Sequence, residues 1–140
     1  MDPARGQEQG VRLLREMLGA EQAERTRQVW REICPDFEDY VVRFLAGDVW
    51  SRPGLDRRAK SLVTIAALAA LGRPLGLELN IRMALNNGAT RQEVVETLLH
   101  LAPYAGFPAC WEGLALAHKV FRDLDGGKDG GERRGSSPPG

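Results

Sequence analysis

The sequence predicts an all-α fold, and three observations carry that prediction. Apolar residues recur at helical spacing through most of the 140 residues, and no segment keeps the two-residue alternation of a strand. The pair Asn87-Gly88 ends a helical pattern instead of joining two strands. The length fits one compact multi-helix domain, which we expect over residues 1–125. Residues 126–140 read GGKDGGERRGSSPPG and offer nothing apolar to bury, so we expect a disordered tail.

Three helices are expected in the N-terminal third of the chain. The first has one apolar face and ends at Gly19, and the second spans 23–33 with Val29, Trp30 and Ile33 facing inward. Pro35 begins the third, because a proline lacks only an N–H that the first turn does not use. The apolar face of this third helix consists of Phe37, Tyr40, Val41, Phe44 and Leu45.

A loop and two further helices follow. Pro53 moves Arg52 out of helical geometry and makes residues 50–54 a rigid loop. Asp56 can cap the next helix, which is apolar on nearly every face from Leu62 to Leu71. Such a helix does not suit the surface of a monomer, so we expect it at a subunit interface. The helix after it ends at Gly88 in a left-handed stop.

The last third of the folded region has clear signals for where helices begin and end. Thr90 and Glu93 form a capping box that starts one helix. Pro103 should kink or end that helix near Ala102. The final helix is expected from about Pro108 to Leu124.

Composition excludes several classes of function. Nineteen basic and nineteen acidic residues give a net charge of zero, which argues against nucleic-acid and anionic membrane partners. The N-terminus is polar and resembles no signal peptide, and the longest apolar run (61–71) is too short to span a bilayer, so a soluble cytoplasmic protein is expected. Cys34 and Cys110 form no CxxC pair and predict no metal site; we interpret them as buried small hydrophobes, with a disulfide between them left open.

Two segments resemble the carboxymuconolactone decarboxylase family, in its order and spacing: WSRPGLDRRAKSLVTIAALAALGR and LNIRMALNNGATRQEVVETLLHLAPYAGFPA. The resemblance covers roughly residues 37–121. It implies the all-α fold of alkylhydroperoxidase D-like proteins. It also implies association into trimers or hexamers, with active sites near subunit interfaces.

One branch of this superfamily reduces peroxides with a C-x-x-C-x-x-x-H motif. In this chain the positions of that motif hold Arg73, Gly76 and Asn80. Peroxide reduction needs a reactive thiolate and a resolving thiol beside it, so this chemistry is not expected from the motif. A thiol peroxidase that uses Cys110 is the second hypothesis.

The other branch decarboxylates a carboxylated muconolactone during the breakdown of aromatic compounds. The substrate's own lactone carbonyl accepts the electrons left by CO₂, so the resemblance implies an enzyme, a carboxy-lyase, with no cofactor and no metal. Such an enzyme supplies cations for carboxylates, a donor for the developing oxyanion and a proton source. Family decarboxylases usually carry histidine where this chain has Asn80, which suggests a related small acid or lactone as substrate.

The candidate site residues follow from this comparison. His100 matches a family histidine and is expected to donate the proton, against the alternative of a core histidine. Asn80 and Glu78 occupy the family's catalytic segment, with Asn80 orienting the substrate or oxyanion. Arg52 is the expected carboxylate anchor, against an ordinary surface salt bridge. Arg58 opposes the dipole at a helix start, which suggests a role in substrate binding or an interface, and Tyr104 can place its hydroxyl in the pocket.

The leading hypothesis is therefore a cofactor-free decarboxylase of a small carboxylate or lactone, working as a cytoplasmic homo-oligomer. A third hypothesis is a non-catalytic oligomeric protein that binds a small molecule, keeping the scaffold without the histidine.

Overall fold

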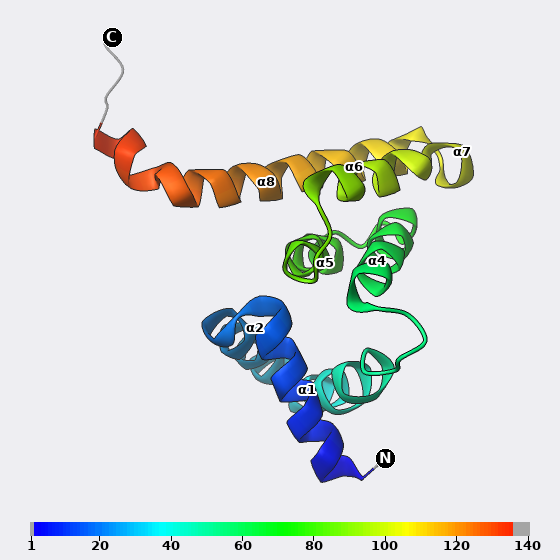
Figure 1. Cartoon of the computed structure of the whole chain (residues 1–140), viewed down its shortest axis with the longest axis vertical. Coiled ribbons are helices and arrows are strands. Elements are labelled where there is room, and N and C mark those ends of the chain that lie inside the picture. Colours follow the sequence, from blue (N-terminus) through cyan, green and yellow to red (C-terminus); the bar gives the residue numbers. More distant parts are fainter. Residues whose placement is uncertain (1, 136–140) are drawn as a thin grey trace. The chain divides into compact units, whose positions relative to one another are not determined.

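The computed structural model describes the backbone of residues 2–135 and the side chains of residues 2–126. Within this part the all-α prediction is confirmed, because helices and their connecting turns account for the described chain and no strand occurs in it (Figure 1). The chain divides into two compact units: residues 1–63 with 82–89, and residues 64–81 with 90–140. Among the described helices, none is long and apolar enough to cross a membrane.

The first unit is built around the crossing of two helices. It contains α1 (Pro3–Leu18), α2 (Ala20–Ile33), α3 (Pro35–Asp39), the π-helix η1 (Tyr40–Val49), the start of α4 (Arg57–Leu71) and the end of α5 (Pro74–Asn86). Gly19 ends α1 with a φ of 86°, as the sequence predicts. Asp56 accepts a hydrogen bond from the Ala59 N–H at 2.8 Å and so caps α4, again as predicted.

Glycines allow α1 and η1 to approach closely. Gly10 lies against the backbone carbonyl of Val42, and Gly47 lies against the carbonyl of Gly6. A Cβ at either glycine would overlap the facing oxygen. Around this crossing Leu14 and Val42 are fully or almost fully buried, so the two helices share one core.

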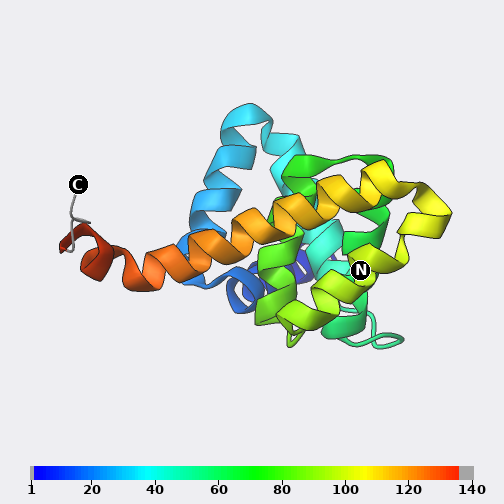
Figure 2. The same ribbon diagram turned by 90° about the horizontal axis from the view of Figure 1, so that it is seen from above.

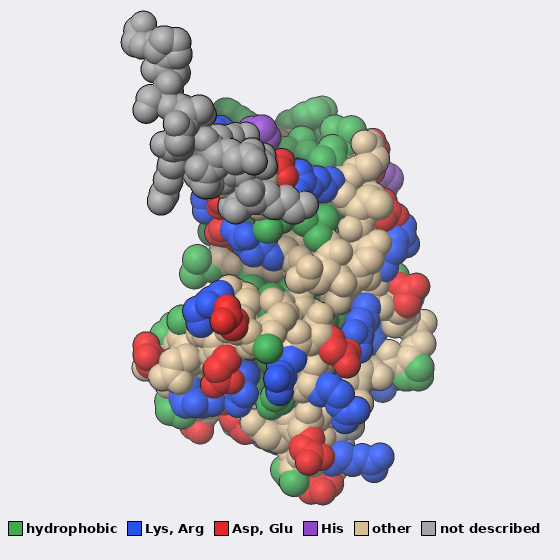
Figure 3. Space-filling view, turned by 60° about the vertical axis from the view of Figure 1, so that its left-hand side comes forward, with side chains coloured by type: hydrophobic (Ala, Val, Ile, Leu, Met, Phe, Trp, Pro, Cys, Tyr) green, Lys and Arg blue, Asp and Glu red, His purple; other side chains and the backbone are tan. Residues whose placement is uncertain are grey.

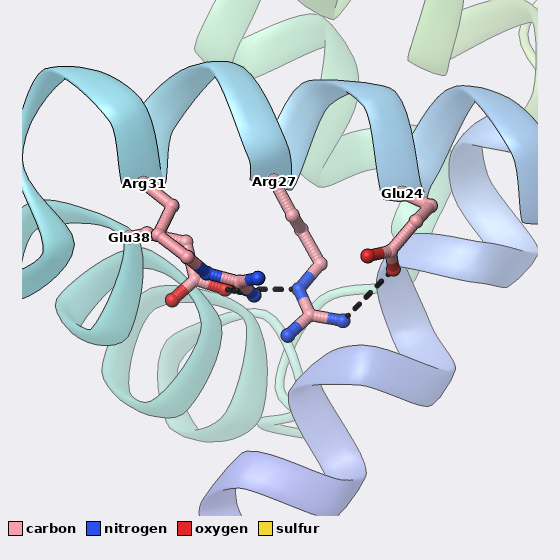
Figure 4. Close-up of polar contacts among 4 residues, drawn as sticks. All are labelled: Glu24, Arg27, Arg31 and Glu38. Carbon is pink, nitrogen blue, oxygen red and sulfur yellow. Dashed lines mark hydrogen bonds and ion pairs between the residues drawn. The ribbon is translucent and has the colours of Figure 1, made fainter.

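Helix α2 packs against α1 and also forms an ionic cluster with α3. Ala23 is its one buried residue among those described. Figure 4 shows the ionic cluster that fixes the rest: Glu38 of α3 accepts hydrogen bonds from Arg27 at 3.0 Å and Arg31 at 3.3 Å, and Arg27 also pairs with Glu24. Only 6% of Glu38 is exposed, and a buried carboxylate is stable only when it is paired in this way.

Two helix faces that the sequence predicts to be buried are exposed in the single chain. Val29 and Ile33 were expected inside but are 53% and 76% exposed. The expected apolar face of residues 37–45 is also largely exposed, while Val42 and Ala46 are buried in its place. The buried residues Glu38, Val42 and Ala46 are spaced four apart, so the segment keeps a helical period but buries a neighbouring face.

The second unit contains the remainder of α4 and α5 together with α6 (Arg91–His100), α7 (Ala102–Ala105) and α8 (Phe107–Gly135). Helices α6 and α8 lie side by side, joined by the short α7 (Figures 1 and 2). Gly113 of α8 permits this packing, since a Cβ there would lie 2.8 Å from the Leu98 side chain. Arg91 and Asp125 add a two-bond ion pair at 2.7 and 2.9 Å, and this hydrogen-bonded partner raises the pKa of the Arg91 guanidinium.

The predicted helix ends in this unit are confirmed. Thr90 accepts a bond from the Glu93 N–H at 3.0 Å, while the Glu93 carboxylate accepts one from the Thr90 N–H at 2.9 Å, which completes the capping box. Gly88 has a φ of 98° just after α5, and α6 stops before Pro103.

The last helix is longer than expected. The sequence places its end near Leu124, whereas α8 continues to Gly135. Extending an existing helix adds one hydrogen bond for each residue fixed, so poor helix formers can follow an anchored one. The separation of a domain over 1–125 from a tail stays a prediction, and residues 136–140 lie outside the described residues.

Candidate active site

His100 and Tyr104 lie together at the end of α6. Their ring centroids are 5.3 Å apart, with the ring planes inclined at 42°. His100 is exposed, so the alternative of a core histidine is wrong. It lines an open hollow of about 560 Å³ with Ala66, Thr97 and Leu101. The imidazole is therefore accessible to solvent and to a ligand, as a proton donor must be.

The two candidates on α5 differ in their surroundings. Asn80 donates a hydrogen bond from its side-chain amide to the Gly76 carbonyl one turn earlier, at 2.8 Å. Glu78 forms an ion pair with Lys119 of α8 at 3.0 Å. Glu78 thus joins α5 to α8.

The loop that carries Arg52 is held by one lysine. The ammonium group of Lys60, one turn into α4, donates hydrogen bonds to the carbonyls of Trp50 at 2.8 Å and Arg52 at 2.5 Å. These bonds give the loop a defined path, in agreement with the rigidity expected from Pro53. The Arg52 side chain itself is exposed in the first unit.

The two arginines at the start of α4, Arg57 and Arg58, differ in their surroundings. Arg57 forms an ion pair with Glu16 of α1 at 2.6 Å, so it helps to fix α4 within the first unit. Arg58 is exposed on the first turn of the same helix. His100, Tyr104, Asn80 and Glu78 belong to the second unit, whereas Arg52 and Arg58 belong to the first.

A pocket in the second unit was missed by the sequence reasoning. It has a volume of about 550 Å³ and lies where α4 ends, α5 begins and α8 passes. Leucine side chains and the charged Arg73, Glu112 and Lys119 line it. One sequence signal points to it: Arg73 stands just before α5, where a cation opposes the helix dipole.

The cysteines give no support to the thiol hypothesis. Both are free, which answers the open question of a disulfide between them. Cys110 is buried, as expected, whereas Cys34 is exposed. In the described part of the chain, no group of three or more His, Cys, Asp and Glu side chains gathers in a way that could hold a metal ion.

Comparison with known proteins identifies relatives over most of the chain. The profile of the carboxymuconolactone decarboxylase family matches residues 35–119. A 4-carboxymuconolactone decarboxylase of Acinetobacter baylyi is 43% identical over 116 residues, which cover 83% of this chain and 87% of that protein. Nitrosuccinic acid decarboxylase npaB of Metarhizium robertsii is 32% identical over 117 residues, covering 84% and 82%. An uncharacterized 15.0 kDa protein of Paracoccus denitrificans is 35% identical over 97 residues, covering 67% and 72%.

These matches confirm the resemblance drawn from the sequence motifs, and the two relatives named as enzymes are both decarboxylases, in agreement with the expected enzyme class. The chain belongs to the carboxymuconolactone decarboxylase family.

Proposed function

We propose that this protein is a cofactor-free carboxy-lyase acting on 4-carboxymuconolactone or a related small acid in the breakdown of aromatic compounds. The observation that carries the proposal is the 43% identity to a 4-carboxymuconolactone decarboxylase across 87% of that protein. The exposed imidazole of His100, in an open hollow on the second unit, supports it with a group that can deliver a proton.

The proposed reaction breaks the bond between a ring carbon and its carboxylate. CO₂ leaves, and the bonding electron pair moves through the adjacent double bond into the lactone carbonyl, forming a dienolate. His100 then gives its proton to carbon and regains one from solvent, with Tyr104 beside it in the hollow. Asn80 donates a hydrogen bond to the oxyanion, which such a donor stabilises most when charge develops. Binding of carboxylate by Arg52 and Arg58 stays a prediction, since both belong to the first unit.

Asn80 is the residue on which substrate choice is proposed to depend. An amide can donate a hydrogen bond but cannot exchange a proton at neutral pH. One relative is named for a different acid, nitrosuccinic acid, so related proteins differ in substrate. A nitro group beside the departing carboxylate accepts electrons as the lactone carbonyl does, and neither reaction needs a cofactor.

The test is CO₂ release from 4-carboxymuconolactone and from nitrosuccinate by the full-length protein. We expect turnover of at least one acid, and we expect Asn80→His to raise kcat/KM for the lactone, because an imidazole can also deliver a proton. Gln28→His, which places an imidazole on the exposed surface of α2, is the control and should change nothing. If the folded protein releases CO₂ from neither acid, the carboxy-lyase proposal is wrong, and binding without turnover would favour the non-catalytic alternative.

We also propose that the protein is a cytoplasmic homo-oligomer, a trimer or hexamer. Many large apolar side chains are exposed in the single chain, some of which appear on the face in Figure 3. On the second unit they include Leu71, Leu75, Phe107 and Trp111, all at least 66% exposed. Monomers rarely expose this much large apolar surface.

Sedimentation equilibrium at micromolar concentration is expected to give three or six times the 15.4 kDa of one chain. Trp111→Glu should reduce that mass, because it would place a charge within an apolar interface. Arg5→Glu, an exposed position on α1, is the control. A wild-type protein that sediments as one chain would contradict the oligomer.

A further inference from the structure

The pocket at the start of α5 has the dimensions of a small-molecule site. Its volume of about 550 Å³ lies within the usual range of roughly 300–1,000 Å³ for ligand pockets. Its apolar side chains are Leu68, Leu77 and Leu116, of which Leu77 is only 4% exposed. This combination suits a small ligand with a flat or apolar body.

The charges at the pocket are not equivalent. Lys119 pairs with Glu78 at 3.0 Å, so its charge is largely compensated. The structure shows no ion pair for Arg73 among the described residues, and Arg73 stands beside the positive end of the α5 dipole. A guanidinium in this place destabilises the helix unless an anion lies nearby. Glu112 is exposed on α8, lines the same pocket and opposes the binding of anions.

We propose that this pocket binds the substrate as a small carboxylate with an unsaturated ring, and that Arg73 is its carboxylate anchor. The three leucines contact the ring, while the guanidinium donates paired hydrogen bonds to the carboxylate. This inference rests on the proposed function, because it is the acid substrate that requires a cationic anchor. It places a binding residue for the acid on the second unit, in a pocket distinct from the hollow that His100 lines.

The direct test is binding of 2-furoate, a stable unsaturated five-membered ring with one carboxylate, to the full-length protein. Methyl NMR signals of Leu68, Leu77 and Leu116 should shift on titration. Arg73→Gln should weaken binding by about tenfold or more, a free-energy change of about 1.4 kcal/mol. Glu112→Gln should tighten binding several-fold, because it removes a like charge from the pocket.

Two controls separate recognition of charge from other effects. Arg5→Gln, also an exposed arginine, should leave the affinity unchanged. The neutral amide 2-furamide should bind more weakly than 2-furoate to the wild type and equally to Arg73→Gln. Shifts confined to other regions, or an unchanged affinity in Arg73→Gln, would overturn the proposal.

The same variants distinguish this inference from the decarboxylase proposal. If 2-furoate binds through Arg73 but neither acid is decarboxylated, the pocket stands and the proposed reaction fails. If an acid is decarboxylated and Arg73→Gln leaves its KM unchanged, the reaction stands and the pocket assignment fails.

Discussion

Gly10→Ala is expected to lower the free energy of unfolding by about 3 kcal/mol, the upper part of the range for overpacked cores. The added Cβ would overlap the backbone carbonyl of Val42 and would lie 3.1 Å from its side chain. Backbone cannot rotate away as a side chain does, so α1 and η1 would have to separate. Val42 is fully buried, and that separation would open the core of the first unit.

Intrinsic helix propensity acts in the opposite direction, which makes the test decisive. Alanine is favoured over glycine inside a helix by up to about 1 kcal/mol. Gly126 in α8 is the matched control, because nothing lies within 4 Å of a Cβ built there. Gly126→Ala should therefore leave the free energy of unfolding unchanged or raise it. Both variants are measured by urea denaturation. A Gly10→Ala protein as stable as the wild type would show that α1 and η1 do not approach as closely at Gly10 as the structure has them.

Local signals in the sequence predicted the helix ends well. The capping box of Thr90 and Glu93, the cap at Asp56 and the left-handed stop at Gly88 all involve residues close together in the chain. Their hydrogen bonds depend on local geometry alone, so they can be inferred without knowing the tertiary structure.

Properties that depend on distant partners were harder to predict. The buried face of η1 carries Val42 and not Phe44, because the close approach of α1 at Gly10 decides which side packs. The ionic cluster at Glu38 joins α2 to α3 while Val29 and Ile33 stay exposed, and it depends on a partner eleven residues from Arg27 that no local pattern identifies.

In the candidate site, too, local motifs were predictable and tertiary contacts were not. The motifs identified the segments with His100 and Asn80, since these lie within the region that matches the family. The pocket beside Arg73 depends on the approach of α4, α5 and α8, and no local motif records that approach. A cation against the helix dipole was the one sequence feature that pointed to it.

His100→Ala is expected to reduce kcat for decarboxylation by about 10²–10⁴-fold, the usual contribution of a general acid. KM should change little, because the imidazole is proposed to protonate the dienolate and not to bind the carboxylate. The variant should fold normally, since His100 is exposed and its removal creates no cavity.

The second histidine of the chain provides the matched control. His118 is exposed on α8, so His118→Ala removes an imidazole without touching the hollow beside α6. Its kcat should equal that of the wild type. Tyr104→Phe keeps the ring that lies 5.3 Å from His100 and removes only the hydroxyl, so it should cost less than tenfold if His100 is the donor. The reverse pattern, with His100→Ala fully active and Tyr104→Phe severely impaired, would assign the proton to the phenol, because the same hollow would then hold a different acid.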